Sequence, residues 1–143
     1  MTGVQTCALP IFKASAAALA AQYSTYKPFS DLGLNGQQTL SENLADLAGI
    51  TAAYEGFQAA TAGQMEPTGA SFTKDQMFFI AFAQKWRVKM REGAFRQQLI
   101  TGSHAPGQYR ALTVRNLDAW YEAFAVNPGQ KQYLAPAERV RVW

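Results

Sequence analysis

The sequence predicts a mainly α-helical fold in a single domain. Apolar side chains recur at steps of three or four residues along 39–60 and again along 73–91, which is the spacing of one helix face. Residues 12–23 are rich in alanine, the residue with the highest helix propensity. No stretch alternates apolar and polar residues over the length of a strand. A chain of 143 residues with 48% apolar and 16% charged residues has the size and composition of one globular domain.

Two helices are expected in the N-terminal half. The alanine-rich helix over 12–23 should end before Pro28 and the turn 33–36, because proline and glycine interrupt helical backbone. A second helix is expected over 39–60. Its apolar stripe consists of Leu40, Leu44, Leu47, Ile50, Tyr54 and Phe57.

A third helix is expected from Thr73 to about Arg91. Gln76 follows Thr73 by three residues, the spacing of a capping box in which each side chain bonds the backbone amide of the other residue. Its apolar stripe consists of Met77 or Phe78, Phe82 and Trp86, continued by Met90. Phe78, Phe79, Phe82 and Trp86 are expected to form a buried face.

The C-terminal third is expected to be less regular. Residues 101–113 are rich in Gly, Ser and Pro and predict a loop. Asn116 is a suitable residue to cap a last short helix over 117–125. The tail after Asn127-Pro-Gly129 is expected to be irregular or a short docked segment.

The positive charges are concentrated in one part of the chain. The net charge is +3, and the cations between 85 and 115 are accompanied by a single acid, Glu92. They are Lys85, Arg87, Lys89, Arg91, Arg96, Arg110 and Arg115. Basic residues near aromatic ones are compatible with nucleic-acid binding, but the aromatic residues here follow helical spacing and predict a buried face. We therefore expect a solvated basic face and no nucleic-acid partner, with an electropositive wall favouring acidic peptide ends as the alternative.

Cysteine content and hydropathy exclude other classes of protein. Cys7 is the only cysteine, which excludes an internal disulfide and a cysteine-rich metal site. No apolar run reaches the roughly 18 residues that span a membrane, and no basic segment precedes a short apolar run as in a secretory signal. We expect no membrane segment in this chain.

Residues 1–12 differ from the sequence that follows. They show no helical periodicity, and Pro10 is expected to separate them from the helix behind it. The segment resembles translated sequencing-adapter read-through, which predicts a non-native or disordered leader over 1–12 and a genuine chain, 13–143, truncated from a longer protein. The alternative is a short, poorly ordered natural N-terminus.

Two short motifs carry the candidate chemistry. The segment Thr39-Leu-Ser-Glu-Asn-Leu-Ala-Asp46 places the carboxylates of Glu42 and Asp46 one helical turn apart on the same face. The segment His104-Ala-Pro-Gly-Gln-Tyr-Arg110 places the only histidine of the chain shortly before an arginine. Spacing alone leaves a second interpretation for Glu42, because Thr39 and Glu42 are also spaced as a capping box.

Together these motifs resemble the neprilysin/endothelin-converting-enzyme family of zinc metallopeptidases, in the C-terminal part of the catalytic domain. There the pattern is Leu-Gly-Glu-Asn-Ile-Ala-Asp, then His-Ser-Pro-Gly-x-Phe-Arg, and finally Arg-Val-Trp, which this chain has at Arg141-Val142-Trp143. The resemblance implies the helical C-terminal part of a gluzincin-type fold. It also implies that Glu42 is the third zinc ligand and that Asp46 hydrogen-bonds a ligand histidine.

The resemblance implies roles for three more residues. His104 would donate a hydrogen bond to the oxyanion of the tetrahedral intermediate. Arg110 would hold a substrate carbonyl by a charge-assisted hydrogen bond, for which one or two of its N–H groups are available. Trp86, in Phe-Ala-Gln-Lys-Trp, would line the pocket for the residue after the scissile bond. The residues alone are also compatible with Arg110 pairing with a scaffold carboxylate such as Asp46, and with Trp86 as plain core.

One element of that family is absent. With a single histidine, this chain cannot contain the His-Glu-x-x-His helix that supplies two zinc ligands and the general base. We therefore expect a fragment of a zinc-dependent endopeptidase or oligopeptidase that neither binds zinc tightly nor cleaves peptides alone. Its partners would be a peptide substrate in the intact parent and the missing N-terminal part of the catalytic domain. Apolar surface left uncovered by that part is expected at Leu40, Leu44 and Leu47.

Two other functions remain open on sequence grounds. The alternative is a non-enzymatic helical module that binds peptides or a partner subunit, and a third is a domain that binds acidic molecules or nucleic acid through the basic stretch. The resemblance favours a periplasmic, extracellular or membrane-tethered location, and we find no targeting signal in these 143 residues.

Overall fold

The computed structural model describes residues 5–66, 69 and 71–142, and all regular elements within these residues are helical. This confirms the predicted mainly α fold. In chain order the elements are α1 (Gln5–Ser24), α2 (Leu40–Thr61), α3 (Lys74–Lys85), α4 (Glu92–Thr101), α5 (Gly107–Ala111), the 3₁₀ helix η1 (Leu112–Asn116), α6 (Asp118–Phe124) and the 3₁₀ helix η2 (Pro136–Glu138). Within the described residues, none of the helices is long and apolar enough to cross a membrane.

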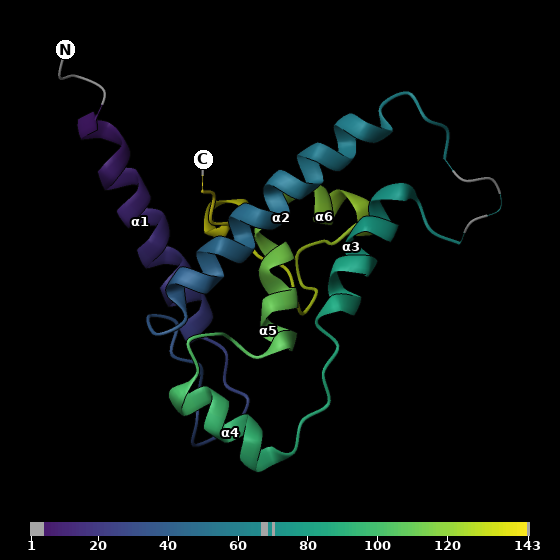
Figure 1. Cartoon of the computed structure of the whole chain (residues 1–143). Helices are drawn as coiled ribbons and strands as arrows, with labels where there is room; N and C mark the ends of the chain where they lie inside the picture. The colour runs from purple at the N-terminus through teal and green to yellow at the C-terminus, as the bar shows by residue number, and fades with distance from the viewer. Residues whose placement is uncertain (1–4, 67–68, 70, 143) are drawn as a thin grey trace.

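Helix α2 is the element around which the others are arranged. It crosses the molecule diagonally in Figure 1, with α1 against its N-terminal end and α5 beneath its middle. Helix α6 lies beside the C-terminal half of α2, and α4 lies at the bottom of the view. Helix α1 and η1 pack on α2, and α3 packs on α6. The main core draws on α1, α2, α3, α4, η1 and the connecting segments. It consists of Leu19, Tyr23, Leu34, Leu47, Ile50, Phe79, Leu99, Ala105, Val114, Leu117 and Val140.

The apolar stripe predicted for the second helix is confirmed as a packing face. Leu47 and Ile50 are 1% and 3% exposed, and Leu40 and Leu44 pack against the same core. The expectation that these leucines form an uncovered surface is therefore wrong for Leu47. The stripe faces α1 and η1, which come from opposite ends of the chain and are both present here.

The N-terminal helix begins earlier than predicted. Helix α1 starts at Gln5 and continues through Pro10, so the expected break between residues 1–12 and the alanine-rich run is absent over 5–12. A proline removes one amide donor and costs about 3 kcal/mol in a helix interior, which weakens a helix without forbidding it. Residues 1–4 of the expected leader lie outside the described residues, as does Trp143.

The predicted third helix is shorter than expected. The capping box at Thr73 and Gln76 is confirmed by both of its hydrogen bonds, but α3 ends at Lys85 and not near Arg91. Met77 and Met90, at the two ends of the predicted stripe, are 40% and 43% exposed, so neither is part of the core. Helix α4 was not predicted, and α5 and η1 occupy much of the expected loop 101–113.

Asn116 is a buried connector and not a helix cap. The last helix forms as predicted, but Leu117 occupies its N-cap position. The Asn116 amide exchanges two hydrogen bonds of 2.9 Å with Gln22 of α1, and its Oδ1 accepts the Val140 amide at 2.8 Å. Beside it, the Tyr23 hydroxyl lies 3.1 Å from Thr113 Oγ1, and burial raises the pKa of Tyr23. These bonds join the first helix to the C-terminal segment.

Replacing Asn116 with alanine should lower the free energy of unfolding by about 2–3 kcal/mol, because buried polar groups of Gln22 and Val140 lose their partner. Urea unfolding followed by circular dichroism measures the change. Gln108→Ala, which truncates an exposed amide, is the matched control and should change the free energy by less than about 0.5 kcal/mol. Equal small effects for both variants would refute the connecting role of Asn116.

Candidate functional site

The five residues singled out in the sequence lie together in the structure. Glu42 and Asp46 lie on one face of α2, because four residues advance a helix by about one full turn. His104, in the loop before α5, places Nε2 3.0 Å from Glu42 Oε2. Arg110 of α5 reaches Asp46 and stacks on Trp86 at the end of α3. We call these five residues the site cluster.

Glu42 does not cap its helix. Thr39 forms no side-chain capping bond; instead its hydroxyl donates to the Asn35 carbonyl and accepts the Asn43 side-chain amide at 2.9 Å. The capping-box interpretation of Glu42 is therefore wrong, since the Thr39 oxygen that it requires is already engaged. The Glu42 carboxylate is left facing His104 and is 36% exposed.

Arg110 is the most constrained charge of the cluster. Its Nε and one Nη2 hydrogen donate to the two oxygens of Asp46, both at 2.7 Å, and its guanidinium carbon lies 4.0 Å from the Trp86 ring centroid. The hydrogen bonds with Asp46 raise the pKa of Arg110. The alternative expectation that Arg110 pairs with Asp46 is confirmed. The Nε–Nη2 edge of the guanidinium is occupied by Asp46, and both Nη1 hydrogens and the second Nη2 hydrogen can still donate.

Trp86 lines a hollow between α2 and α3 and also packs on Arg110 and Phe82. A hollow of ≈ 440 Å³ lies between α2 and α3, with Asp46 and Trp86 among the residues that line it. The α2 side is made of small residues, and the α3 side is aromatic. The lining residues are Ala45, Asp46, Gly49, Ile50, Ala53, Phe78, Ala81, Phe82, Lys85 and Trp86. We call this hollow the α2–α3 groove.

Residues that the sequence did not single out hold the His104 loop in place. The Gln38 side-chain amide donates to the carbonyls of Ile100 and Gly102, at 3.2 and 2.8 Å. A side chain at Gly102 would lie 2.5 Å from the Gln98 carbonyl oxygen, so this close turn requires glycine. Ala105, directly after His104, is 1% exposed. A glutamine before a predicted helix carries no signal for such a role, which depends on a contact across 64 residues.

Gly107 sets the distance between α5 and α3. It is the first residue of α5, and a Cβ at this position would lie 2.6 Å from the Trp86 backbone oxygen. Because glycine has no side chain, α5 can approach the end of α3. Arg110, one turn further along α5, then reaches both Trp86 and Asp46.

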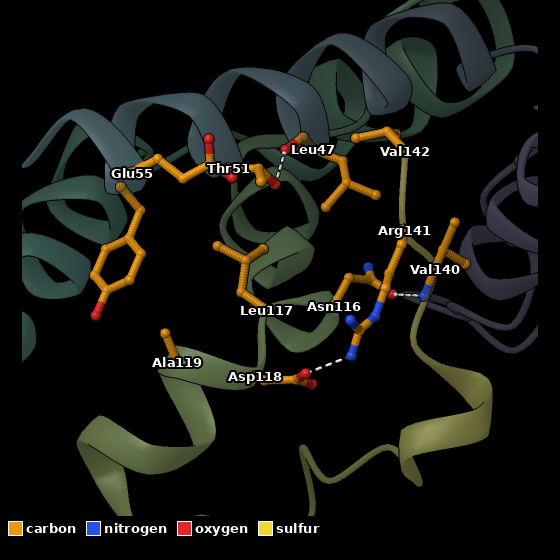
Figure 2. A pocket seen from close by; sticks show the side chains of 11 residues that line it. Leu47, Thr51, Glu55, Asn116, Leu117, Asp118, Ala119, Val140, Arg141 and Val142 are labelled. Atoms are coloured by element: carbon orange, nitrogen blue, oxygen red, sulfur yellow. Dashed lines mark hydrogen bonds and ion pairs between the residues drawn. The ribbon is translucent and has the colours of Figure 1, made fainter. Parts of the chain in front are cut away.

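A second pocket lies on the other side of α2. Figure 2 shows Leu47, Thr51 and Glu55 of α2 facing the start of α6 and the C-terminal segment around a cavity of ≈ 240 Å³. Arg141 at its rim is paired with Asp118 at 2.5 Å. None of the five residues of the site cluster lines this pocket, and Glu55 cannot join Glu42 in a common site.

The site cluster alone is an incomplete metal site. The described residues contain no group of three or more His, Cys, Asp and Glu side chains placed to hold one ion. Glu42 Oε2 lies 3.0 Å from His104 Nε2 and has no second carboxylate, cysteine or histidine beside it that would complete such a group among the described residues.

A double-mutant cycle should show that the Arg110–Asp46 pair stabilises the fold. Both side chains are less than a fifth exposed, so the coupling free energy between Asp46→Ala and Arg110→Ala should be about 1–3 kcal/mol, measured by urea unfolding. The exposed pair of Arg96 with Asp31 is the control and should show a smaller coupling. No coupling between Asp46 and Arg110 would contradict this prediction.

Gly107→Ala should destabilise the protein by about 1–3 kcal/mol, because the new methyl group forces α5 away from the Trp86 carbonyl. Gly93→Ala is a suitable control, since a Cβ at Gly93 in α4 meets no atom within 4 Å. That variant should be neutral or stabilising, because alanine favours a helix. Thermal unfolding of both variants checks the prediction, which fails if the two behave alike.

The sequence of the chain matches a known family over nearly its whole length. The model of Peptidase family M13 matches residues 1–140. Neprilysin-3 of Drosophila melanogaster is 34% identical over 137 residues, which are 92% of this chain and 17% of that protein. Human endothelin-converting enzyme-like 1 is 37% identical over 114 residues, which are 77% of this chain and 14% of that protein. The chain thus spans less than a fifth of the length of these relatives.

Solved structures agree with the sequence comparison. The Mycobacterium tuberculosis zinc metalloprotease Zmp1 in complex with an inhibitor aligns with a TM-score of 0.87 at 34% identity, over 92% of this chain and 21% of that one. PepO from Lactobacillus rhamnosis HN001 aligns with a TM-score of 0.78 at 33% identity, over 94% and 20% of the two chains. These matches confirm the resemblance found in the motifs. The chain belongs to peptidase family M13, the neprilysin family of metallopeptidases, and corresponds to the helical C-terminal part of its members.

Proposed function

We propose that the site cluster is one part of the active site of a zinc-dependent endopeptidase or oligopeptidase, in which Glu42 is a zinc ligand. One observation carries this proposal: Glu42, Asp46, His104 and Arg110 come from two segments far apart in sequence and meet within direct bonding distance. A surface assembled by chance has no reason to place the four matching polar residues of two family motifs in two close pairs on one helix face.

The donor set fits a shared zinc site and not a complete one. Catalytic zinc keeps three protein ligands and one open position. Glu42 is partly exposed and its carboxylate takes no part in a helix cap, so this carboxylate is available as one ligand. The single histidine of the chain cannot supply the other two. We propose that these ligands and the general base come from a segment outside these 143 residues. Bound zinc would polarise the scissile carbonyl and activate a water molecule.

The remaining residues of the cluster have roles that their positions support. His104 Nε2–H can donate to an oxyanion that develops near Glu42, and donors of this kind are worth about 10²–10³ in rate. Arg110 can donate Nη1 to a substrate carbonyl while Asp46 holds its other edge. The Trp86 ring offers an apolar wall for a substrate side chain. Asp46, with both oxygens already bonded to Arg110, retains lone pairs for a ligand histidine.

The α2–α3 groove is the proposed contact surface for the segment that completes the site. Ala45, Gly49 and Ala53 are exposed and follow each other at steps of four along α2, beside Asp46. Small residues allow the backbone of another helix to approach closely, and the aromatic α3 wall supplies apolar area. A helix seated there would lie next to the Glu42 and Asp46 carboxylates, which is where the missing ligands are needed.

A non-enzymatic module that binds a peptide or a partner subunit is the second candidate. The observation that favours it is the α2–α3 groove, an open hollow with a largely aromatic α3 wall. Arg110 and the α2–α3 groove would then serve binding alone, and zinc would have no part in the function.

A chimera tests the enzymatic proposal. The aligned part of Zmp1 is replaced by residues 13–140 of this chain, which keeps the family's other segments, and peptide hydrolysis and zinc content are measured. The chimera should cleave peptides. Glu42→Gln should lower the rate by at least about a hundredfold and reduce bound zinc, because loss of a ligand costs more than loss of a residue that supports one.

Glu55→Gln, on the opposite side of the same helix, is the control and should change neither quantity. The 143-residue chain alone should lose zinc on dialysis. About one tightly held ion per chain, or a chimera equally active with Glu42→Gln, would overturn the proposed assignment of Glu42.

A further inference from the structure

Two close polar contacts, a hydrogen bond and a charged-pair contact, link Ser103, His104 and Glu42 in the site cluster. Ser103 Oγ lies 3.1 Å from His104 Nδ1, and His104 Nε2 lies 3.0 Å from Glu42 Oε2. Both ring nitrogens of His104 therefore have partners. Ser103 matches neither family motif described above, and neither its spacing nor its type drew attention to it in the sequence.

The chemistry of the two partners determines which nitrogen carries the proton in the neutral ring. An ionised carboxylate only accepts hydrogen bonds, so the contact with Glu42 requires a proton on His104 Nε2. Nδ1 is then an acceptor, and the Ser103 hydroxyl must donate to it. If the ring is protonated on both nitrogens, the hydroxyl oxygen accepts from Nδ1, so Ser103 suits either state.

The backbone around these two residues is fixed on both sides. Gln38 donates to the Gly102 carbonyl just before Ser103, and Ala105 is buried just after His104. The His104 side chain itself is 49% exposed, so burial restrains its ring only in part. The polar contacts at its two nitrogens are therefore the main restraint on the ring orientation.

We propose that Ser103 is a positioning residue, which holds the His104 ring with Nε2–H directed toward Glu42. The orientation itself is independent of zinc or catalysis. Its consequence rests on the proposed function: when Glu42 binds the metal, Ser103 remains as the bond that keeps Nε2–H directed at the position of the oxyanion.

Nitrogen NMR tests the orientation on the chain as it exists. His104 is the only histidine, so ¹⁵N-histidine labelling gives one ring and needs no assignment. At alkaline pH the wild-type ring should be mainly the Nε2–H tautomer. The Ser103 hydroxyl can pair with either tautomer, so its effect on the tautomers comes from holding Nε2 beside Glu42. Ser103→Ala should let the ring rotate away from Glu42 and lower the ratio of Nε2–H to Nδ1–H tautomers by up to about three- to tenfold. Ser103→Thr, which keeps the hydroxyl, should restore it.

Ser41→Ala is the matched control, because Ser41 is an exposed serine adjacent to Glu42 in sequence. It should leave the tautomer ratio unchanged. A Ser103→Ala spectrum identical to that of the wild type would overturn the proposal, as would an equal change with Ser41→Ala.

The Zmp1 chimera separates this inference from the proposed function. Ser103→Ala should lower kcat about tenfold with little change in KM, and Ser103→Thr should recover the loss. A tautomer change without a kcat change would support the positioning of the ring and contradict the catalytic role of His104. An unchanged tautomer ratio in a chimera that still depends on Glu42 would refute the positioning role alone.

Discussion

The ion pair between Arg110 and Asp46 is the interaction on which the arrangement of the site depends. It joins α5 to α2 across 64 residues of sequence, and the stacking of the same guanidinium on Trp86 brings in α3. The planar guanidinium can form both contacts at once, whereas a lysine ammonium could not. The loop that carries His104 leads directly into α5, so this pair and the Gln38 hydrogen bonds together place His104 beside Glu42.

Local sequence rules predicted the parts of this site that depend on local structure. The helical period placed Glu42 and Asp46 on one face, and the same period identified the packed stripe of α2. The contact between His104 and Glu42 was not predicted, since it depends on a loop held by Gln38 and Gly102. The short helix α5 was missed because helices of this length have little intrinsic stability and form through tertiary contacts. The alternative capping box at Thr39 does not form, because its hydroxyl instead donates to the Asn35 carbonyl and accepts from the Asn43 side-chain amide.

The basic stretch divides into two groups in the folded chain. Arg96, Arg110 and Arg115 bond to acceptors within the protein. The four cations Lys85, Arg87, Lys89 and Arg91 are exposed along the end of α3 and the segment that follows. They flank Trp86, so their field extends over one end of the α2–α3 groove. These exposed cations match the solvated basic face expected from the sequence, and added salt would screen their field.

The small residues along α2 are constrained differently in the isolated chain and in an assembled domain. A side chain added at Gly49 would meet no atom within 4 Å, and alanine there would strengthen the helix itself. Mutational tolerance measured on this chain alone would therefore rank Gly49 as a freely variable position. If a further helix packs against this face, the same position becomes one of the least variable in the assembled domain. Deep mutational profiles of the short chain and of an assembled peptidase would then differ most on the Ala45, Gly49 and Ala53 face.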